Sequence, residues 1–273
     1  MTSTTIAVIG ATGKTGRRVA DLLEERGRDV RRLSRGTTPA FDWDRPEAWR
    51  QALDGIDRLY AAYVPDLATP EAAAAITRLT EIAGDAGVRH IVLLSGRGED
   101  GARRSEDIVL ASGIPATVVR ASWFMQNFTE GMLRDSVLTG VLAVPAGGMR
   151  EPFIDIDDIA EVAVEALTGT GHEGRVHEVT GPQSLTFTEV AALLSEIHGR
   201  EVQYVPVSFD EFHAAVAATE GPEVATMLTE LCREVFDGRN ESPTSGVLEA
   251  LGRPPRDART VLTEAARVGA WAA

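Results

Sequence analysis

Three glycines placed three residues apart are the residues of this sequence best suited to chemistry. Gly10, Gly13 and Gly16 directly follow an apolar run, in the segment Gly10-Ala11-Thr12-Gly13-Lys14-Thr15-Gly16. Glycine accepts the positive φ of a tight strand-to-helix turn and lets the backbone approach a pyrophosphate closely. The helix that follows would add unpaired amides and a partial positive charge. The segment therefore predicts a dinucleotide-binding turn, because it stands at the first strand-to-helix junction of the chain.

The triplet Gly13-Lys14-Thr15 also matches the end of an ATP-binding P-loop, whose pattern is G-x-x-x-x-G-K-[ST]. The first glycine of that motif would have to stand at position 8, which is Val8. Since Val8 belongs to the expected strand, the loop that would wrap the phosphates is missing. The spacing therefore argues against a kinase or an ATPase of that type.

The end of the second expected strand, over residues 29–34, indicates which dinucleotide binds. NAD sites place a carboxylate about 20 residues beyond the glycines, where it binds the ribose 2′-hydroxyl. This chain has Ser34 and Arg35 there instead. Arg35 can pair as a forked donor with a 2′-phosphate, and Ser34 can add a hydroxyl group. We therefore expect NADP(H) rather than NAD; the alternative is an Arg35 that only faces solvent.

Strands and helices must alternate to bring such loops to one edge of a sheet, and the hydrophobic pattern alternates in this way. This indicates a doubly wound parallel sheet, a Rossmann fold, over residues 1–150. Beyond Arg150 the rhythm changes, and we expect residues 151–273 to form a smaller, substrate-side α/β lobe, partly interwoven with the first domain. The expected helices are 15–26, 49–56, 70–86, 105–111, 157–167 and 186–197; the expected strands are 5–9, 29–34, 58–62, 90–94, 116–119, 176–180 and 202–205.

The composition bears on partners and location. Twenty-seven basic against 41 acidic residues give a net charge of −14, so we expect no nucleic-acid partner. No apolar run approaches the ~18 residues of a membrane helix, and residues 1–5 lack the pattern of a signal peptide. We therefore expect no membrane partner and a cytoplasmic location. The single cysteine, Cys232, fits a reducing compartment, and five scattered histidines predict no metal site.

Four further stretches, together with the glycine loop and Arg35, resemble the NmrA-like branch of the atypical short-chain dehydrogenase/reductases. These stretches are residues 112–120 (SGIPATVVR), 123–128 (WFMQNF), 152–160 (PFIDIDDIA) and 179–186 (VTGPQSLT). The resemblance extends over nearly the whole chain and is specific to the family but not to a substrate. Such families include NADPH-dependent reductases of quinones, dyes and other conjugated small molecules. They also include non-catalytic nucleotide sensors that bind transcription regulators.

The resemblance implies which residues contact the ligands. The nucleotide is expected against the glycine loop and against Ser34, Arg35, Asp42, Ala61, Ala62 and Ser95. The substrate is expected against Tyr63, Phe124, Asn127 and Phe153. Ordinary short-chain dehydrogenases use a Tyr-x-x-x-Lys pair to move the proton that accompanies hydride transfer. Gly98 and Ala102 stand at those positions here, and neither side chain can transfer a proton.

Two functions stay open at this point. In the first, an NADPH-dependent reductase transfers hydride directly to a quinone or another small, planar conjugated carbonyl compound, and the cofactor carries the chemistry. Ser95 and Tyr63 are then the catalytic candidates, with Arg104 and Asn127 as further polar groups. In the second, the protein senses the redox state of NADP(H) and passes it to a regulatory protein partner. We favour the reductase, because family members without the Tyr-Lys pair still reduce substrates.

Other residues have structural interpretations. Asp155, Asp157 and Asp158 precede an expected helix, and we interpret them as its cap rather than as acid–base groups. Cys232 is interpreted as a small buried hydrophobic residue. The segments 211–218 and 223–235 carry apolar stripes at helical spacing. They fit either a lid over the substrate or the contact of a homodimer.

Overall fold

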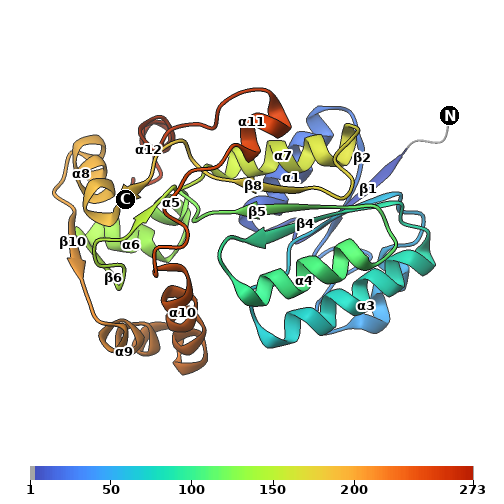
Figure 1. The fold of residues 1–273 in the computed structure, drawn as a ribbon, viewed down its shortest axis with the longest axis horizontal. Coiled ribbons are helices and arrows are strands. Elements are labelled where there is room, and N and C mark those ends of the chain that lie inside the picture. The colour runs from blue at the N-terminus through green and yellow to red at the C-terminus, as the bar shows by residue number, and fades with distance from the viewer. Residues whose placement is uncertain (1–3, 273) are drawn as a thin grey trace.

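The computed structural model describes residues 4–272 and has a six-stranded parallel sheet at its centre (Figure 1). Its strand order is β2-β1-β3-β4-β5-β8, and every neighbouring pair is parallel. Parallel strands are usually covered by helices on both faces, which is why these segments consist of nearly continuous apolar residues. The predicted doubly wound sheet is confirmed. Its strands are β1 (Thr5–Ile9), β2 (Asp29–Leu33), β3 (Arg58–Ala61), β4 (His90–Gly96), β5 (Ala116–Ala121) and β8 (Val176–Val179).

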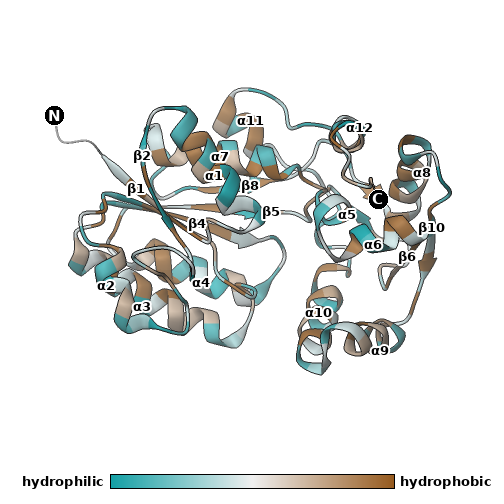
Figure 2. Ribbon diagram, turned by 180° about the vertical axis from the view of Figure 1, so that it is seen from behind, coloured by the Kyte–Doolittle hydropathy of each residue, from teal (hydrophilic) through white to brown (hydrophobic). Residues whose placement is uncertain are grey.

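Helices cover the two faces of this sheet with separate hydrophobic cores. Successive strand residues point to opposite faces, so Ile6 and Val8 pack with one set of helices while Ala7 and Ile9 pack with the other. One face carries α1 (Lys14–Glu25), α7 (Ile156–Thr168) and α11 (Gly246–Leu251). The opposite face carries α2 (Trp49–Ala52), α3 (Pro70–Ala86) and α4 (Asp100–Ala111), with a short 3₁₀ turn (Pro46–Ala48) before α2. Figure 2 shows the apolar sides of these helices turned toward the sheet.

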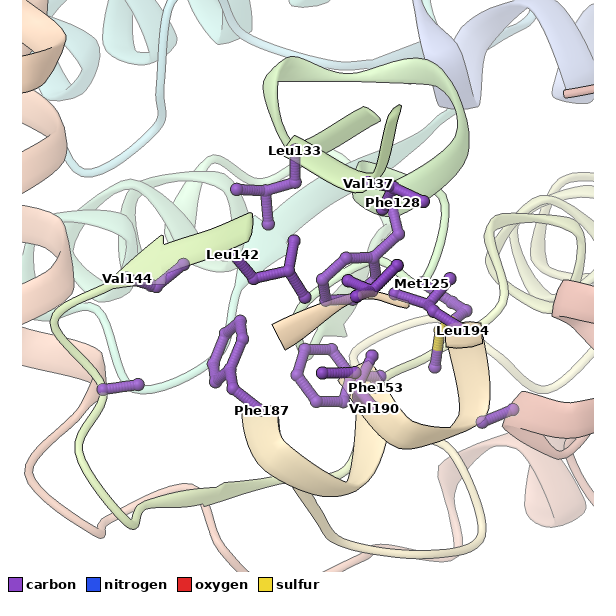
Figure 3. Packing of buried hydrophobic residues seen from close by; sticks show 14 of the residues in the cluster. Met125, Phe128, Leu133, Val137, Leu142, Val144, Phe153, Phe187, Val190 and Leu194 are labelled. Carbon is purple, nitrogen blue, oxygen red and sulfur yellow. The ribbon is translucent and has the colours of Figure 1, made fainter. Parts of the chain in front are cut away.

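A smaller lobe lies beyond the carboxyl ends of the strands (Figure 1). Its core is a separate cluster rich in aromatic residues, in which Phe128, Phe153 and Phe187 meet (Figure 3). The lobe holds two small sheets, β6 (Val141–Val144) with β10 (Gln203–Pro206) and β7 (Arg150–Glu151) with β9 (Leu185–Thr186). Its helices are α5 (Asn127–Glu130), α6 (Met132–Thr139), α8 (Phe187–His198), α9 (Phe209–Glu220), α10 (Pro222–Val235) and α12 (Ala258–Arg267).

The predicted boundary after residue 150 does not separate these two parts. Strand β8, from the second half, pairs with β5 and completes the central sheet. Helix α7 packs on α1, and α11 packs on α7 and β8. Conversely α5, α6 and β6, from the first half, belong to the small lobe. The chain crosses between the parts several times, so a single cut point in the sequence cannot divide them.

Several local signals are confirmed by the structure. The spacing Thr186-x-x-Glu189 predicts a capping box, and these two residues form one at the start of α8. Asp155 caps α7 by accepting a hydrogen bond from the Asp157 amide, as predicted, and Asp158 is fully buried against Arg253 and Arg256. Helix α4 begins at Asp100, five residues before the predicted start, because its first turn lies buried against other elements. Among residues 4–272, no helix is long and apolar enough to cross a membrane.

Candidate functional site

The order of the strands changes direction between β1 and β3. Strand β2 pairs with one side of β1, and β3 pairs with the other side. In open parallel sheets, ligands bind outside the carboxyl ends of the strands at such a switch point. The glycine loop follows β1 at this place, and Ala61 and Ala62 stand at the end of β3. The topology therefore brings two sets of predicted nucleotide residues to one edge of the sheet.

Each glycine of the loop has a different role in its backbone geometry. Gly10 has a φ of +78°, in the left-handed region that favours glycine. The Gly13 amide donates a 2.8 Å hydrogen bond to the Gly10 carbonyl oxygen, which closes the turn. A Cβ atom on Gly16 would lie 2.7 Å from the Gly10 carbonyl carbon, so the helix packs this closely only on a glycine. The Gly10 and Ala11 amides donate to the Leu33 carbonyl at 3.1 and 3.3 Å, which ties the turn to β2.

The first turn of α1 is free to bind an anion. The helix begins at Lys14, and no side chain caps it at Gly13. The first amides of a helix have no acceptor within it, and the helix dipole adds a partial positive charge there. Thr12 is exposed at the tip of the turn, whereas Thr15 is buried beneath it. A pyrophosphate fits this cradle because no side chain claims the donors and no glycine Cβ fills the space.

Arg35 stands at the end of β2 with its guanidinium group free. It is exposed, and its side chain makes no hydrogen bond or ion pair with any residue between 4 and 272. Arg32 on the same strand is different, because it pairs with Asp21 at 2.5 Å and with Glu24 at 2.8 Å. The Ser34 hydroxyl accepts a 3.3 Å hydrogen bond from the Gly36 amide, which fixes the loop. The free arginine fits the forked donor that a 2′-phosphate requires.

The loop before α2 is fastened against the end of β3. The Trp43 indole donates to the Ala62 carbonyl at 3.3 Å, and the Trp49 indole donates to the Asp42 carbonyl at 2.6 Å. The Tyr63 ring packs against the Trp43 ring, and the two ring centres are 4.8 Å apart. Asp42, Ala62 and Tyr63 therefore lie on one rim of the site. The contact of Asp42, Ala61 and Ala62 with the nucleotide stays a prediction.

A cavity of about 520 Å³ lies beside the glycine loop, a size usual for small-molecule sites. It brings together Lys14, Tyr63, Ser95, Phe124 and Asn127, which the sequence analysis placed on the nucleotide or on the substrate. The Lys14 ammonium donates a 2.8 Å hydrogen bond to Asn127 Oδ1 and so links the glycine loop to the small lobe. Most of the other lining residues are apolar: Pro65, Leu67, Leu94, Ala121, Trp123, Leu133, Val144, Phe212, Leu228 and Leu231.

Phe153, a predicted substrate residue, lies elsewhere. Its side chain is 3% exposed, and its ring centre lies 5.6 Å from that of Phe128 and 5.4 Å from that of Phe187 (Figure 3). It is not among the residues that line the cavity. The alternation of side chains explains the error, because Ile154 packs toward the central sheet and Phe153 turns into the small-lobe core. Arg104, for which a solvent-facing helix charge was the favoured interpretation, is exposed on α4 and also does not line the cavity.

Ser95 lies at the cavity wall, but its proton is already engaged. Its hydroxyl donates a 2.6 Å hydrogen bond to Glu106 Oε1. Glu106 is 1% exposed and is paired with Arg120, which also bonds Glu178 at 3.1 Å. Arg97 bonds the other oxygen of Glu178 at 2.7 Å. This network of hydrogen bonds and ion pairs connects β4, α4, β5 and β8 beneath the cavity. Ser95 therefore serves to hold the end of β4 in place rather than to donate a proton to a substrate.

Two other proton-bearing groups line the cavity. Burial raises the pKa of the Tyr63 hydroxyl, so it keeps its proton near neutral pH and can donate a hydrogen bond. Burial also raises the pKa of the Cys232 thiol to about 12. Because the thiolate is the reactive form, Cys232 acts as part of the apolar wall, as the sequence analysis predicted.

The comparison with known sequences now decides the family. Residues 103–242 match the sequence model of the NmrA-like family. A (4-alkanoyl-5-oxo-2,5-dihydrofuran-3-yl)methyl phosphate reductase of Streptomyces griseus is 34% identical over 275 residues, which cover 93% of this chain and 95% of the relative. The chain belongs to the NmrA-like family.

Further relatives and solved structures agree with this assignment. An NAD(P)H azoreductase of Xenophilus azovorans is 32% identical over 280 residues, covering 92% of this chain and 94% of the relative. An NADPH-dependent quinone oxidoreductase of Escherichia coli, solved with NADPH, superposes with a TM-score of 0.81. It is 23% identical, and the match covers 95% of this chain and 99% of that one. The NmrA-like family accounts for the Rossmann-type sheet and for the glycine loop at its switch point.

This NmrA-like chain lacks a Tyr-x-x-x-Lys pair. The residues at the two positions, Gly98 and Ala102, have structural roles instead. Gly98 has a φ of +80°, and a Cβ atom there would lie 2.5 Å from Asn240 Nδ2. Ala102 is fully buried in the core beneath α4. Neither residue lines the cavity. Among residues 4–272, there is also no group of three His, Cys, Asp or Glu side chains that could hold a metal ion.

Two acidic residues of the cavity, Asp66 and Glu99, were missed by the sequence analysis. Glu99 lines the cavity beside Ser95 and Gly96, and its carboxyl group packs directly against Gly96. The helix was expected to begin at residue 105, so Glu99 stood in an expected loop and the sequence carried no sign of a role for it. The available signal was its place next to Gly98, where the aligned tyrosine is missing. Glu151 is a second buried acid nearby, and burial raises its pKa to about 7.

Proposed function

We propose that this protein is an NADPH-dependent reductase that transfers hydride directly to a quinone or to another small conjugated carbonyl compound. The observation that carries the proposal is the largely apolar cavity that shares Lys14 with the glycine loop. An apolar cavity with a few polar groups suits a planar organic substrate and excludes water from it. NADPH supplies the hydride when it is bound, and the residues described below position the substrate.

The polar groups of the cavity have distinct positioning roles in this proposal. Lys14 and Asn127 hold the glycine loop and the small lobe in one arrangement through their 2.8 Å hydrogen bond. Phe124, which is half-buried at the cavity wall, offers an aromatic surface to a planar substrate. Tyr63 keeps its proton and can donate a hydrogen bond to a substrate carbonyl. Ser95 holds the end of β4 in place through Glu106.

The relatives support an oxidoreductase that uses NADPH. Two relatives above 30% identity are named as reductases, one for an alkanoyl-oxo-dihydrofuranyl methyl phosphate and one for azo compounds. The solved quinone oxidoreductase contains NADPH. A conjugated acceptor also suits the missing Tyr-Lys pair, because charge that develops on the substrate delocalises over its π system. The open cavity favours the reductase over a sensor, for which a filled pocket is expected.

A panel of hydride acceptors tests this proposal. We expect NADPH oxidation, followed by its absorbance, with menadione, with a 2-acyl butenolide and with 2-cyclohexenone. Cyclohexanone is the matched control, since it differs from cyclohexenone only by the conjugating double bond, and we expect its turnover to be at least ~100-fold slower because no Tyr-Lys acid polarises an isolated ketone. Tight NADPH binding without turnover of any conjugated acceptor would contradict the proposal.

Arg35→Ala should weaken binding of NADP(H) selectively. A forked charge-assisted pair with the 2′-phosphate is worth about 1.5–3 kcal/mol, which corresponds to roughly a 10- to 100-fold loss of affinity. Binding of NADH, which lacks this phosphate, should change little. Fluorescence titration with both nucleotides measures the two affinities. Arg28→Ala is the matched control, because Arg28 is exposed just before the opposite end of the same strand; equal losses for both variants would refute the role of Arg35.

A further inference from the structure

We propose that Glu99 is the proton donor of this reductase, giving to the substrate the proton that follows the hydride. The inference rests on the proposed function, because it concerns a conjugated acceptor bound in the same cavity. Nothing in the sequence pattern assigns this residue. Two acidic side chains, Asp66 and Glu99, line the cavity, and Glu99 is the one that follows β4, next to Gly96.

The geometry frees Glu99 from the role that its position suggests. Glu99 is the N-cap residue of α4, yet its side chain makes no capping hydrogen bond. Glu234 from α10 takes that place, accepting a 2.7 Å hydrogen bond from the Asp100 amide. The Glu99 carboxyl group instead packs on Gly96, where any Cβ atom would collide with it. Within the described residues, 4–272, this carboxyl group has no hydrogen-bond or ion-pair partner.

The surroundings of Glu99 favour its protonated form. Burial comes first among the causes that raise its pKa well above the ordinary value, and neighbouring carboxylates add to the effect. These carboxylates come from the loop after β3, from α10, from α4 and from β7: Asp66, Glu234, Glu106 and Glu151. The opposite side holds charges of both signs: Arg97, Asp100, Arg103, Arg120, Glu178 and Arg239. A carboxyl group kept neutral in this way can act as a general acid.

The other proton-bearing groups of the cavity are less suited to the step. The Ser95 hydroxyl donates its hydrogen bond to Glu106, and the Lys14 ammonium donates a hydrogen bond to Asn127. Cys232 has a pKa near 12 and lies in the apolar wall. Two competitors remain. Tyr63 also keeps its proton, and burial also raises the pKa of Asp66, although its carboxyl group accepts a 2.8 Å hydrogen bond from the Ala68 amide. The experiment must therefore separate Glu99 from Tyr63 and from Asp66.

A second cavity supplies a route for returning the proton. This cavity of about 300 Å³ is polar, and Glu99, Gly96 and Arg97 line both it and the substrate cavity. The exposed residues Asp100 and Arg103 stand at its wall, so it reaches the surface. Glu99 thus lies between the substrate space and a polar path to solvent. A carboxylate formed there can regain its proton without opening the substrate cavity.

The proposed step balances with the hydride that NADPH supplies. An enone gains that hydride at its β-carbon and becomes an enolate. The O–H bond of the Glu99 carboxyl group then breaks as a C–H bond forms at the α-carbon, which yields the saturated carbonyl compound and a Glu99 carboxylate. Water returns one proton to the carboxylate. The net change is one hydride and one proton added to the substrate.

Glu99→Gln keeps the size of the side chain and removes the acid. With 2-cyclohexenone or a 2-acyl butenolide, we expect kcat to fall by about 100-fold or more, within the usual range for a lost general acid. Wild-type kcat should be high while Glu99 is protonated and should fall as pH rises through its raised pKa; the variant should lose this dependence. Tyr63→Phe and Asp66→Asn are the matched comparisons, and both should keep the pH dependence.

A cationic triphenylmethane dye serves as an acceptor that needs hydride but no proton. If the wild type reduces it, Glu99→Gln should reduce it at a similar rate, with unchanged NADPH affinity and thermal midpoint. An equal loss on the dye and on the enone would overturn the proposal in favour of a structural role. So would a loss of the pH dependence in Tyr63→Phe or in Asp66→Asn instead of in Glu99→Gln.

A measurement without turnover separates this inference from the proposed function. The infrared difference spectrum of the wild type minus Glu99→Gln, recorded near neutral pH with and without NADPH, should contain the carbonyl stretch of a protonated carboxyl group. An ionised Glu99 would overturn the proton-donor role even in an active enzyme. A protonated Glu99 in a protein that reduces no acceptor would support the acid and count against the proposed reaction.

Discussion

Gly16→Ala is expected to disrupt the glycine loop and to lower NADP(H) affinity by at least ~100-fold, roughly 2.7 kcal/mol. The added methyl group would lie 2.7 Å from the Gly10 carbonyl carbon and 3.2 Å from the Ala11 amide nitrogen. Both are backbone atoms, so no side-chain rotation relieves the clash. Either α1 moves away from β1 or the turn opens, and both changes displace the amides that hold the pyrophosphate. Overpacking of this kind also destabilises the fold by about 1–3 kcal/mol.

Gly84→Ala is the matched control for this prediction. Gly84 lies inside α3, and a Cβ atom there would meet only Ile114 Cδ1, at 3.8 Å. Replacing an unstrained helical glycine by alanine stabilises a protein by about 0.5–1 kcal/mol. Urea unfolding and NADPH titration of both variants measure the contrast. Unchanged affinity and stability in Gly16→Ala would mean that the helix does not pack on the turn as described.

Arg120→Met is expected to destabilise the protein by about 3–5 kcal/mol, because it leaves a buried carboxylate without its cation. Glu106 is 1% exposed and shares its two oxygens between Ser95 and Arg120. Arg120 also bridges to Glu178 on β8, so its loss unfastens the edge strand contributed by the second half of the chain. Urea unfolding monitored by tryptophan fluorescence gives the free energy of unfolding directly.

Two further variants make this result specific. Arg259→Met removes an arginine that pairs with Glu196 through bonds of 2.7 and 2.8 Å, but both side chains are mainly exposed, so little change is expected. The double variant Arg120→Met, Glu106→Gln removes the buried charge as well, and it should be about 1–2 kcal/mol more stable than Arg120→Met alone. A double variant that is no more stable would show that the loss comes from packing rather than from the unpaired carboxylate.

The small lobe shows which features of the structure local sequence patterns can predict. The capping box of α8 and the Asp155 cap of α7 were predicted, because a cap depends on side chains and amides only two or three residues apart. Strand β6 and helices α5 and α6 were missed, since each is short and is stabilised by partners elsewhere: β6 pairs with β10, α6 packs on β6, and α5 packs on α6. Short elements carry too few residues for a periodic pattern.

The sequence by itself determined the residues that we propose to hold the nucleotide. The steric constraints on the three glycines, Gly10, Gly13 and Gly16, lie within one turn, and Arg35 follows the next strand. The residue types and their spacing therefore predict dinucleotide binding directly. Only the tertiary structure decided what surrounds the substrate. Three contacts that decide this come from other elements. Phe153 packs on Phe187, the Ser95 hydroxyl donates a hydrogen bond to Glu106, and Glu234 accepts the hydrogen bond of the Asp100 amide, so Glu99 does not cap the helix. Glu234 stands 134 residues from the amide that it caps, and no local pattern records a contact over such a separation.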